Sequence, residues 1–84
     1  MSLEALTEAL RKEKLTFGTR ETLRKLGTGK AHTIFLAADC KEDIRKKISY
    51  YATLGKITVH ELKQKSHEIA QICKKNYPVS VISY

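Results

Sequence analysis

The 84-residue sequence has little of what marks several classes of protein. It contains no tryptophan and only two cysteines, too few for the disulfide framework of a small secreted domain. No apolar run approaches the roughly 18 residues that a membrane-spanning helix needs. The stretch from Met1 to Ala5 lacks the basic start and apolar core of a signal peptide. We therefore expect a cytoplasmic protein that does not associate with membranes.

Positive charge is what the sequence has in excess. Sixteen lysines and arginines against nine aspartates and glutamates give a net charge of +7 and an isoelectric point near 9.6. On so small a surface, this excess favours a polyanionic partner such as nucleic acid, the alternative being a basic protein without one. The length predicts a single domain over residues 1–84, with a modest core and no deep substrate cavity.

The spacing of apolar residues predicts four helices, each followed by a strand. The first helix is expected over residues 2–13, and the predicted N-caps of the four helices are Ser2, Thr19, Asp39 and Ser66. Glycines end the second and third helices, at Gly27–Gly29 and at Gly55. The strands are expected over residues 15–17, 32–38, 57–60 and 79–82. This alternation predicts an α/β domain with helices on both faces of a small sheet.

Motifs for catalysis and metal binding are incomplete in this sequence. The stretch from Gly27 to Lys30 is a fragment of a phosphate-binding loop, but a helix precedes it and a strand follows, the reverse of the required order. His60 and His67 each begin a zinc-protease-like helix in which Gln replaces the second histidine. We therefore expect no catalytic residue, no metal site and no cofactor. An enzyme that uses one of the two cysteines is a remote alternative.

The junction between the first strand and the second helix is the first candidate binding site. Gly18 allows a ligand to approach the backbone, and the exposed amides that begin the helix at Thr19 favour a phosphate. Arg20 and Arg24 share one helix face and can bind phosphate or a guanine edge, while Glu21 can accept from a base amino group. The alternative is a capped helix with a solvated charged face.

A second basic cluster lies between the fourth helix and the last strand. Lys74 and Lys75 can contact phosphates, and Tyr77 offers a ring on which an unpaired base can stack, at about 1–3 kcal/mol per base. The alternative is a pair of lysines that favour the helix C-terminus, with Tyr77 packed on the core.

Several stretches resemble a known family when they are taken in order. The segment from Gly18 to Thr22, with Leu26 and the Gly29-Lys30 turn, resembles the kink-turn-binding ribosomal protein superfamily of archaea and eukaryotes. Further stretches are most similar to the large-subunit ribosomal protein L-thirty-e family: Asp43 through Leu54, Glu68 through Cys73, Lys75, and Val79 through Ile82. The resemblance spans about residues 15–84.

The resemblance implies a fold and a binding mode. The fold is a three-layer α/β/α sandwich with a small four-stranded mixed sheet, one end of which grips a sharply bent, purine-rich internal loop of RNA. The implied RNA contacts are Gly18, Thr19, Arg20, Glu21 and Arg24 at the second helix, Lys41 before the third, and Lys74, Lys75 and Tyr77 after the fourth. Asn is frequent in the family at the position of Arg20. Ala70 and Lys74 stand where the family usually has glycine, and Pro78 is also a departure.

The implied function is that of an RNA-binding structural component of the large ribosomal subunit, acting in translation. Its partners would be ribosomal RNA and neighbouring ribosomal proteins, and outside the particle it would be a monomer. The alternatives are a core protein of a small RNA-guided particle, a stand-alone RNA regulator, and a basic protein-interaction module.

Overall fold

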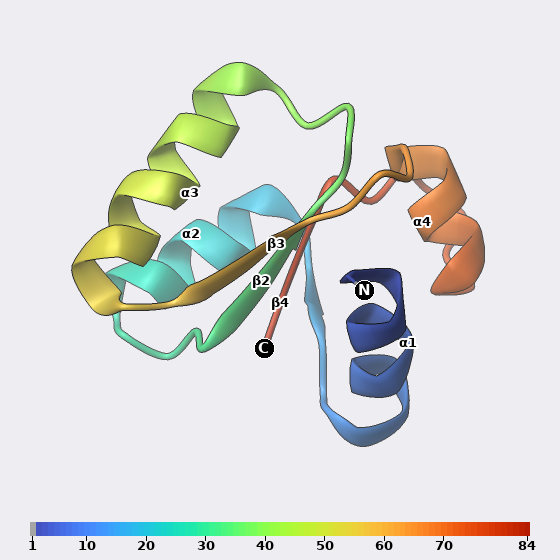
Figure 1. The fold of residues 1–84 in the computed structure, drawn as a ribbon, viewed down its shortest axis with the longest axis horizontal. Helices are drawn as coiled ribbons and strands as arrows, with labels where there is room; N and C mark the ends of the chain where they lie inside the picture. The colour runs from blue at the N-terminus through green and yellow to red at the C-terminus, as the bar shows by residue number, and fades with distance from the viewer. Residues whose placement is uncertain (1) are drawn as a thin grey trace.

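The computed structural model describes residues 2–84, in which four helices alternate with four strands (Figure 1). In chain order these are α1 Ser2–Lys12, β1 Thr16–Phe17, α2 Thr19–Gly27, β2 Thr33–Leu36, α3 Glu42–Gly55, β3 Thr58–Glu61, α4 Ser66–Ile72 and β4 Val81–Ser83. The predicted order is confirmed. Three strands are shorter than predicted: the first begins at Thr16, the apolar run 32–38 forms a strand only over 33–36, and the last strand spans Val81–Ser83.

The sheet is mixed and has the strand order β1-β4-β2-β3. β2 pairs with β3 in parallel, while β4 lies antiparallel to both of its neighbours, β1 and β2. The side chains of β2 from Ile34 to Leu36 are all buried, as expected of a central strand covered on both faces.

Helices cover both faces of this sheet, and each face has its own apolar cluster. Phe35 and Ile82 pack with Leu6 of α1 and Ile69 of α4. On the other face, the alternating neighbours Ile34, Leu36 and Val81 pack with Leu26 of α2 and Ile48 of α3. Figure 1 shows α1 and α4 on one side of the strands and α2 and α3 on the other. The predicted α/β class and the three-layer α/β/α sandwich are confirmed.

The predicted N-caps are wrong for three of the helices. The N-cap of α2 is Gly18 rather than Thr19, that of α3 is Lys41 rather than Asp39, and that of α4 is Lys65 rather than Ser66. The described side chains begin at Glu4, so the cap predicted at the side chain of Ser2, the first residue of α1, lies outside the described side chains. Long-range contacts hold the residues before α2 and α3, where the Gly18 amide donates to the Val81 carbonyl and Asp39 accepts from the Ser66 amide. At α4 the contact is local, since the Lys65 amide donates to the Glu68 carboxylate at 3.1 Å.

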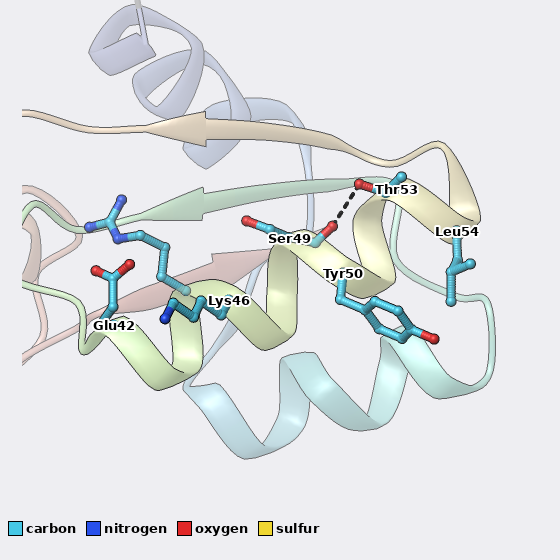
Figure 2. Close-up of a pocket in the computed structure, with 7 residues that line it drawn as sticks. Glu42, Lys46, Ser49, Tyr50, Thr53 and Leu54 are labelled. Atoms are coloured by element: carbon cyan, nitrogen blue, oxygen red, sulfur yellow. Dashed lines mark hydrogen bonds between the residues drawn. The ribbon is translucent and has the colours of Figure 1, made fainter.

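Three of the four helices, α2, α3 and α4, are followed by a residue with positive φ that closes the last turn. Gly29 has this role after α2, Lys56 after α3 and Lys74 after α4, with φ of 72°, 54° and 58°. The predicted stop at Gly55 is the last helical residue, but Lys56 takes the left-handed conformation. Within α3, the Thr53 hydroxyl donates to the Ser49 carbonyl one turn earlier, at 2.9 Å (Figure 2).

The turn after α4 bears on one predicted departure from the family. The Lys75 amide donates to the Ala70 carbonyl at 2.8 Å and the Lys74 amide to that of Gln71 at 3.2 Å, the paired bonds of a Schellman motif. Lys74 therefore adopts the backbone conformation that glycine favours, although it carries a side chain. Ala70, the other departure, is buried in the core.

The helices also bear on the expectation about membranes. Within residues 2–84, no helix is both long and apolar enough to cross a bilayer.

Candidate nucleic-acid interface

Four connections meet at one end of the sheet, which we call the loop end: β1–α2, β2–α3, β3–α4 and α4–β4. The Gly18 amide donates to the Val81 carbonyl at 2.9 Å, joining the first connection to the start of β4. The Ala38 amide donates to the Gln64 carbonyl at 2.8 Å, joining the second and third connections. Because β4 runs antiparallel to β1 and β2, its start lies beside their ends. The start of α2 with Gly18, and the connection that carries Lys41, are thus brought to one end of the sheet.

Gly18 has a backbone conformation that favours glycine. Its φ of 111° and ψ of 150° lie in a region that residues with a Cβ rarely adopt. No atom lies within 4 Å of where a Cβ would stand, so the position faces open space. The first amides of α2 follow directly, and helix-start amides have no intrahelical acceptor. The junction therefore presents an open backbone and free N–H donors, an arrangement suited to an anion.

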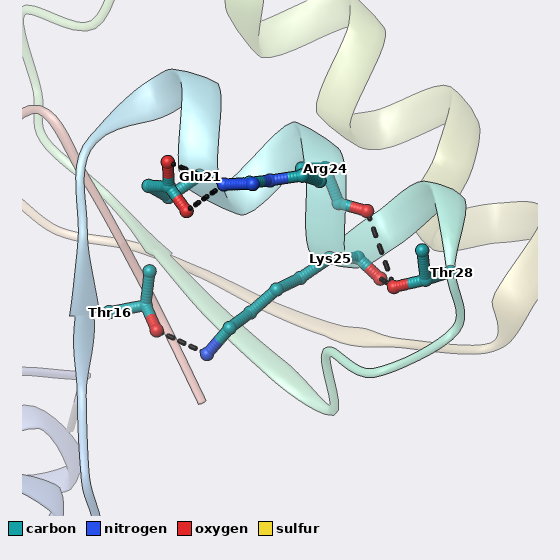
Figure 3. A network of polar contacts seen from close by, with 5 residues as sticks. All are labelled: Thr16, Glu21, Arg24, Lys25 and Thr28. Carbon is teal, nitrogen blue, oxygen red and sulfur yellow. Dashed lines mark hydrogen bonds and ion pairs between the residues drawn. The ribbon is translucent and has the colours of Figure 1, made fainter.

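The charged side chains of α2 divide into a paired set and an unpaired one. Arg24 donates through Nη2 to both carboxylate oxygens of Glu21, at 3.0 and 3.1 Å (Figure 3). Exposed pairs of this kind contribute about 0.2–1 kcal/mol, so a ligand can displace the pair at small cost. Within residues 2–84, the exposed Arg20 side chain makes no hydrogen bond or ion pair.

Two contacts that the sequence did not predict hold α2 against the sheet. The Thr22 hydroxyl donates to the Ser83 hydroxyl at 3.1 Å, and both side chains are fully buried. Lys25 donates to the hydroxyl of Thr16 in β1 (Figure 3). The helix that carries the arginines is thus fixed to both β1 and β4, which limits the conformational freedom that binding must remove.

The α4–β4 connection brings one of its predicted residues to the Gly18 junction. Lys75 Nζ lies 4.5 Å from the centroid of the Phe17 ring, and Phe17 directly precedes Gly18. Lys74 is exposed, and Tyr77 is 48% exposed, so the alternative in which this ring packs on the core is wrong. Lys75 therefore lies next to the residue that precedes the Gly18 junction, and an exposed ring lies on the same connection.

The β2–α3 connection, which carries the exposed Lys41, is held by a carboxylate. Asp39 accepts from the Ser66 amide and from its hydroxyl, both at 2.9 Å. These bonds stabilise the ionised carboxylate and lower the pKa of Asp39, the Ser66 amide having the largest effect. Asp39 thus joins this connection to the start of α4 rather than capping α3. No local pattern predicts this contact, because its partners lie far apart in the sequence.

Arg45 holds the same connection from the other side. Its Nη2 donates to the carbonyl oxygens of Ala37 and Ala38, at 3.2 and 3.5 Å, and its Nη1 pairs with Glu61 at the end of β3. No local sequence pattern predicts these contacts of Arg45. Its position one turn into α3, facing the ends of two strands, follows from the fold.

The cysteines and histidines form no site. Both thiols are free, and burial raises the pKa of Cys40 and of Cys73, the opposite of the change that activates a nucleophilic thiolate. Among the described residues, no three His, Cys, Asp or Glu side chains are placed to hold a metal ion. The geometry thus offers no support to the thiol-enzyme alternative.

Known proteins share both the sequence pattern and the fold. Residues 2–84 match the ribosomal protein L7Ae/L30e/S12e/Gadd45 family. The large ribosomal subunit protein eL30 of Sulfolobus acidocaldarius is 31% identical over 77 residues, covering 92% of this chain and 74% of the relative. The eL30 protein of Sulfurisphaera tokodaii is 29% identical over 77 residues, with 92% and 73% covered.

A solved structure agrees in fold. It is that of a protein with unknown function from Bacillus halodurans C, with a TM-score of 0.80, 20% identity, and coverage of 98% of this chain and 81% of that one. At this identity the likeness concerns the fold alone. The family match extends over nearly the whole chain and confirms the resemblance predicted from the sequence. The chain therefore belongs to the ribosomal protein L7Ae/L30e/S12e/Gadd45 family.

Proposed function

We propose that this protein is an RNA-binding structural component of the large ribosomal subunit, and that its loop end grips a kinked or internal-loop RNA. Its relatives in Sulfolobus acidocaldarius and Sulfurisphaera tokodaii carry the name large ribosomal subunit protein. The observation that carries the binding site is the junction at Gly18, where an open backbone and helix-start amides are followed by the exposed Arg20 and preceded by Phe17, the ring that Lys75 contacts. The protein acts in the cytoplasm, on the ribosome, and not as an enzyme.

The loop end would recognise RNA by two kinds of contact. Phosphates would bind the first amides of α2 and the unpaired Arg20, since backbone contacts fix the position of a nucleic acid. Displacement of Arg24 from Glu21 onto a second phosphate would free the Glu21 carboxylate to accept from a base amino group. An unpaired base would stack on the exposed ring of Tyr77.

The remaining predicted residues would act mainly through charge. Lys41 and Lys74 are exposed in connections at the loop end. With the net charge of +7, they would attract RNA over a distance set by ionic strength. Thr19 contributes its backbone amide as the first residue of α2.

Two measurements test this function. A tagged chain expressed in its own cells should sediment with large ribosomal subunits in a gradient and remain there after a high-salt wash. Recovery on a small RNA-guided particle instead, or free of RNA, would contradict the ribosomal assignment. In filter binding, a kink-turn hairpin should bind tighter than a fully paired duplex of equal length. Equal affinities would contradict recognition of a bent loop.

A further inference from the structure

The outer surface of α3 carries aromatic and apolar side chains that the core does not use. Tyr50, Tyr51 and Leu54 are 62%, 41% and 66% exposed, whereas Ile48 and Ala52 form the buried side of the helix. The two tyrosine rings meet edge to face, with centroids 5.5 Å apart and planes at 74°. This contact orients both rings while much of each stays open to solvent.

A hollow of about 430 Å³ lies between α2 and α3, which we call the tyrosine groove. Its lining is Leu23, Gly27, Lys46, Lys47, Tyr50 and Tyr51. A second hollow of about 450 Å³ lies along α3 and shares Lys46 and Tyr50 with the first. Figure 2 shows Tyr50 projecting from α3, with Lys46 one turn before it. The Tyr50 ring therefore borders both hollows.

The tyrosine groove begins near the loop end. Both α2 and α3 begin there, and they run side by side away from it (Figure 1). Arg20 precedes Leu23 by three residues and Gly27 by seven, so these three positions share one face of α2. An extended ligand that passes from the loop end over Arg20 would therefore reach the tyrosine groove next.

The charges of the lining select among possible occupants. The groove has two lysines and no acidic residue, and a second copy of a chain with net charge +7 would be repelled. Exposed aromatic rings with basic side chains one helical turn away suit a nucleic acid strand, with bases on the rings and phosphates at the lysines. An acidic peptide would satisfy the lysines, but it would leave the two rings without planar partners.

We propose that the tyrosine groove binds single-stranded RNA that flanks the kinked element, with a base stacked on Tyr50 or Tyr51 and phosphates at Lys46 and Lys47. This proposal rests on the proposed function, because the loop end delivers the strand. In this proposal α3 is a second RNA contact surface. It adds affinity for the flanking strand but does not contribute to recognition of the kink.

The test compares RNA probes and matched variants. The probes are a blunt kink-turn hairpin, the same hairpin with a six-adenosine extension on either strand, and the free extension, each extension carrying one 2-aminopurine. The variants are Tyr50→Ala with Tyr51→Ala, and Tyr50→Phe with Tyr51→Phe as the control that keeps both rings. Circular dichroism and melting establish that each variant is folded, which the exposure of both side chains favours.

We expect one extension to tighten binding of the unchanged protein by about fivefold or more, since a single stack of ~1 kcal/mol corresponds to that factor. The 2-aminopurine fluorescence should fall on binding. The alanine pair should lose both effects and keep its affinity for the blunt hairpin, while the phenylalanine pair should retain both.

The failures of the two proposals are distinguishable. If the blunt hairpin binds and neither extension adds affinity, the groove proposal is overturned and the proposed function stands. If the blunt hairpin does not bind but the free extension does, and the alanine pair loses it, the groove proposal stands alone. Two other results would overturn the groove proposal. One is a dimer in sedimentation that depends on the two tyrosines. The other is tyrosine-dependent binding of an amphipathic peptide of Glu and Leu when the RNA extensions have no effect.

Discussion

Replacement of Gly18 by alanine tests the backbone geometry on which the RNA site depends. At φ 111° and ψ 150°, a residue with a Cβ is strained by about 1–3 kcal/mol. No steric clash adds to this figure, because no atom lies within 4 Å of the new Cβ. For a domain of this size, 1 kcal/mol shifts the melting temperature by about 4–8 °C. We expect Gly18→Ala to melt roughly 4–24 °C below the unchanged protein.

The chain offers a matched control in Gly27. It ends α2, has no positive φ, and likewise has open space where a Cβ would stand, with no atom within 4 Å. Gly27→Ala should therefore stabilise the fold by about 0.4–1 kcal/mol, by restricting the unfolded chain. Urea and thermal unfolding of both variants give the comparison. If Gly18→Ala proves as stable as Gly27→Ala, the positive φ at the junction is not required.

The same variant separates stability from binding. Well below its melting range, Gly18→Ala should still bind a kink-turn hairpin more weakly, because the methyl group projects into the open space beside the α2 amides. Unchanged affinity in a filter-binding titration would show that RNA does not approach this backbone closely, and would refute the proposed site even if the strain is real.

Three further predictions concern charges and buried polar groups. Arg20→Ala with Arg24→Ala should weaken binding of a kink-turn RNA. The slope of log affinity against log salt concentration should become shallower by roughly 0.7–0.9 for each lost phosphate contact. An unchanged slope in filter binding would show that these arginines do not contact phosphates. Thr22→Val should cost about 1–3 kcal/mol in urea unfolding by leaving a buried Ser83 hydroxyl unpaired, and adding Ser83→Ala should recover part of that loss. The folded state lowers the pKa of Asp39 below its ordinary 3.8, so its stabilising contribution is present at neutral pH and is lost as the pH falls from 3.8 through the lower folded-state pKa. Asp39→Ala should therefore lower the melting temperature at pH 7, and the difference from the unchanged protein should shrink as the pH is lowered through that range.

Apolar periodicity was sufficient to predict the layers of this fold. The apolar run around Ile34 to Leu36 is continuous because this strand is covered by helices on both faces. A continuous apolar run therefore predicts that the strand lies in the centre of the sheet. Helix starts were less predictable. Asp39 has the local spacing of a cap, yet its carboxylate bonds to Ser66 in a distant loop, a contact that depends on strand order.

The candidate site was predictable to a similar degree. The Gly18 junction follows from a glycine between a strand and a helix, and its positive φ agrees with that interpretation. The position of Lys75 over Phe17 could not be predicted, because it requires the α4–β4 connection to return beside β1. The tyrosine groove was also missed: Tyr51 follows the buried Ile48 by three residues, a spacing that indicates the buried side of a helix, but Tyr51 is exposed.

The distribution of ion pairs bears on the proposed RNA contact at the loop end. Among the described residues, three basic side chains form ion pairs: Lys12 with Glu8, Arg24 with Glu21 and Arg45 with Glu61. Arg20, Lys41 and Lys74 are exposed and make no side-chain ion pair within residues 2–84. A ligand that binds these three need not break an existing pair, and the connections that hold them are already fixed by hydrogen bonds. The free-energy cost of ordering the loops on binding would then be small. By the proposed function, this is how a small domain would hold a strongly bent RNA without an enclosed cavity.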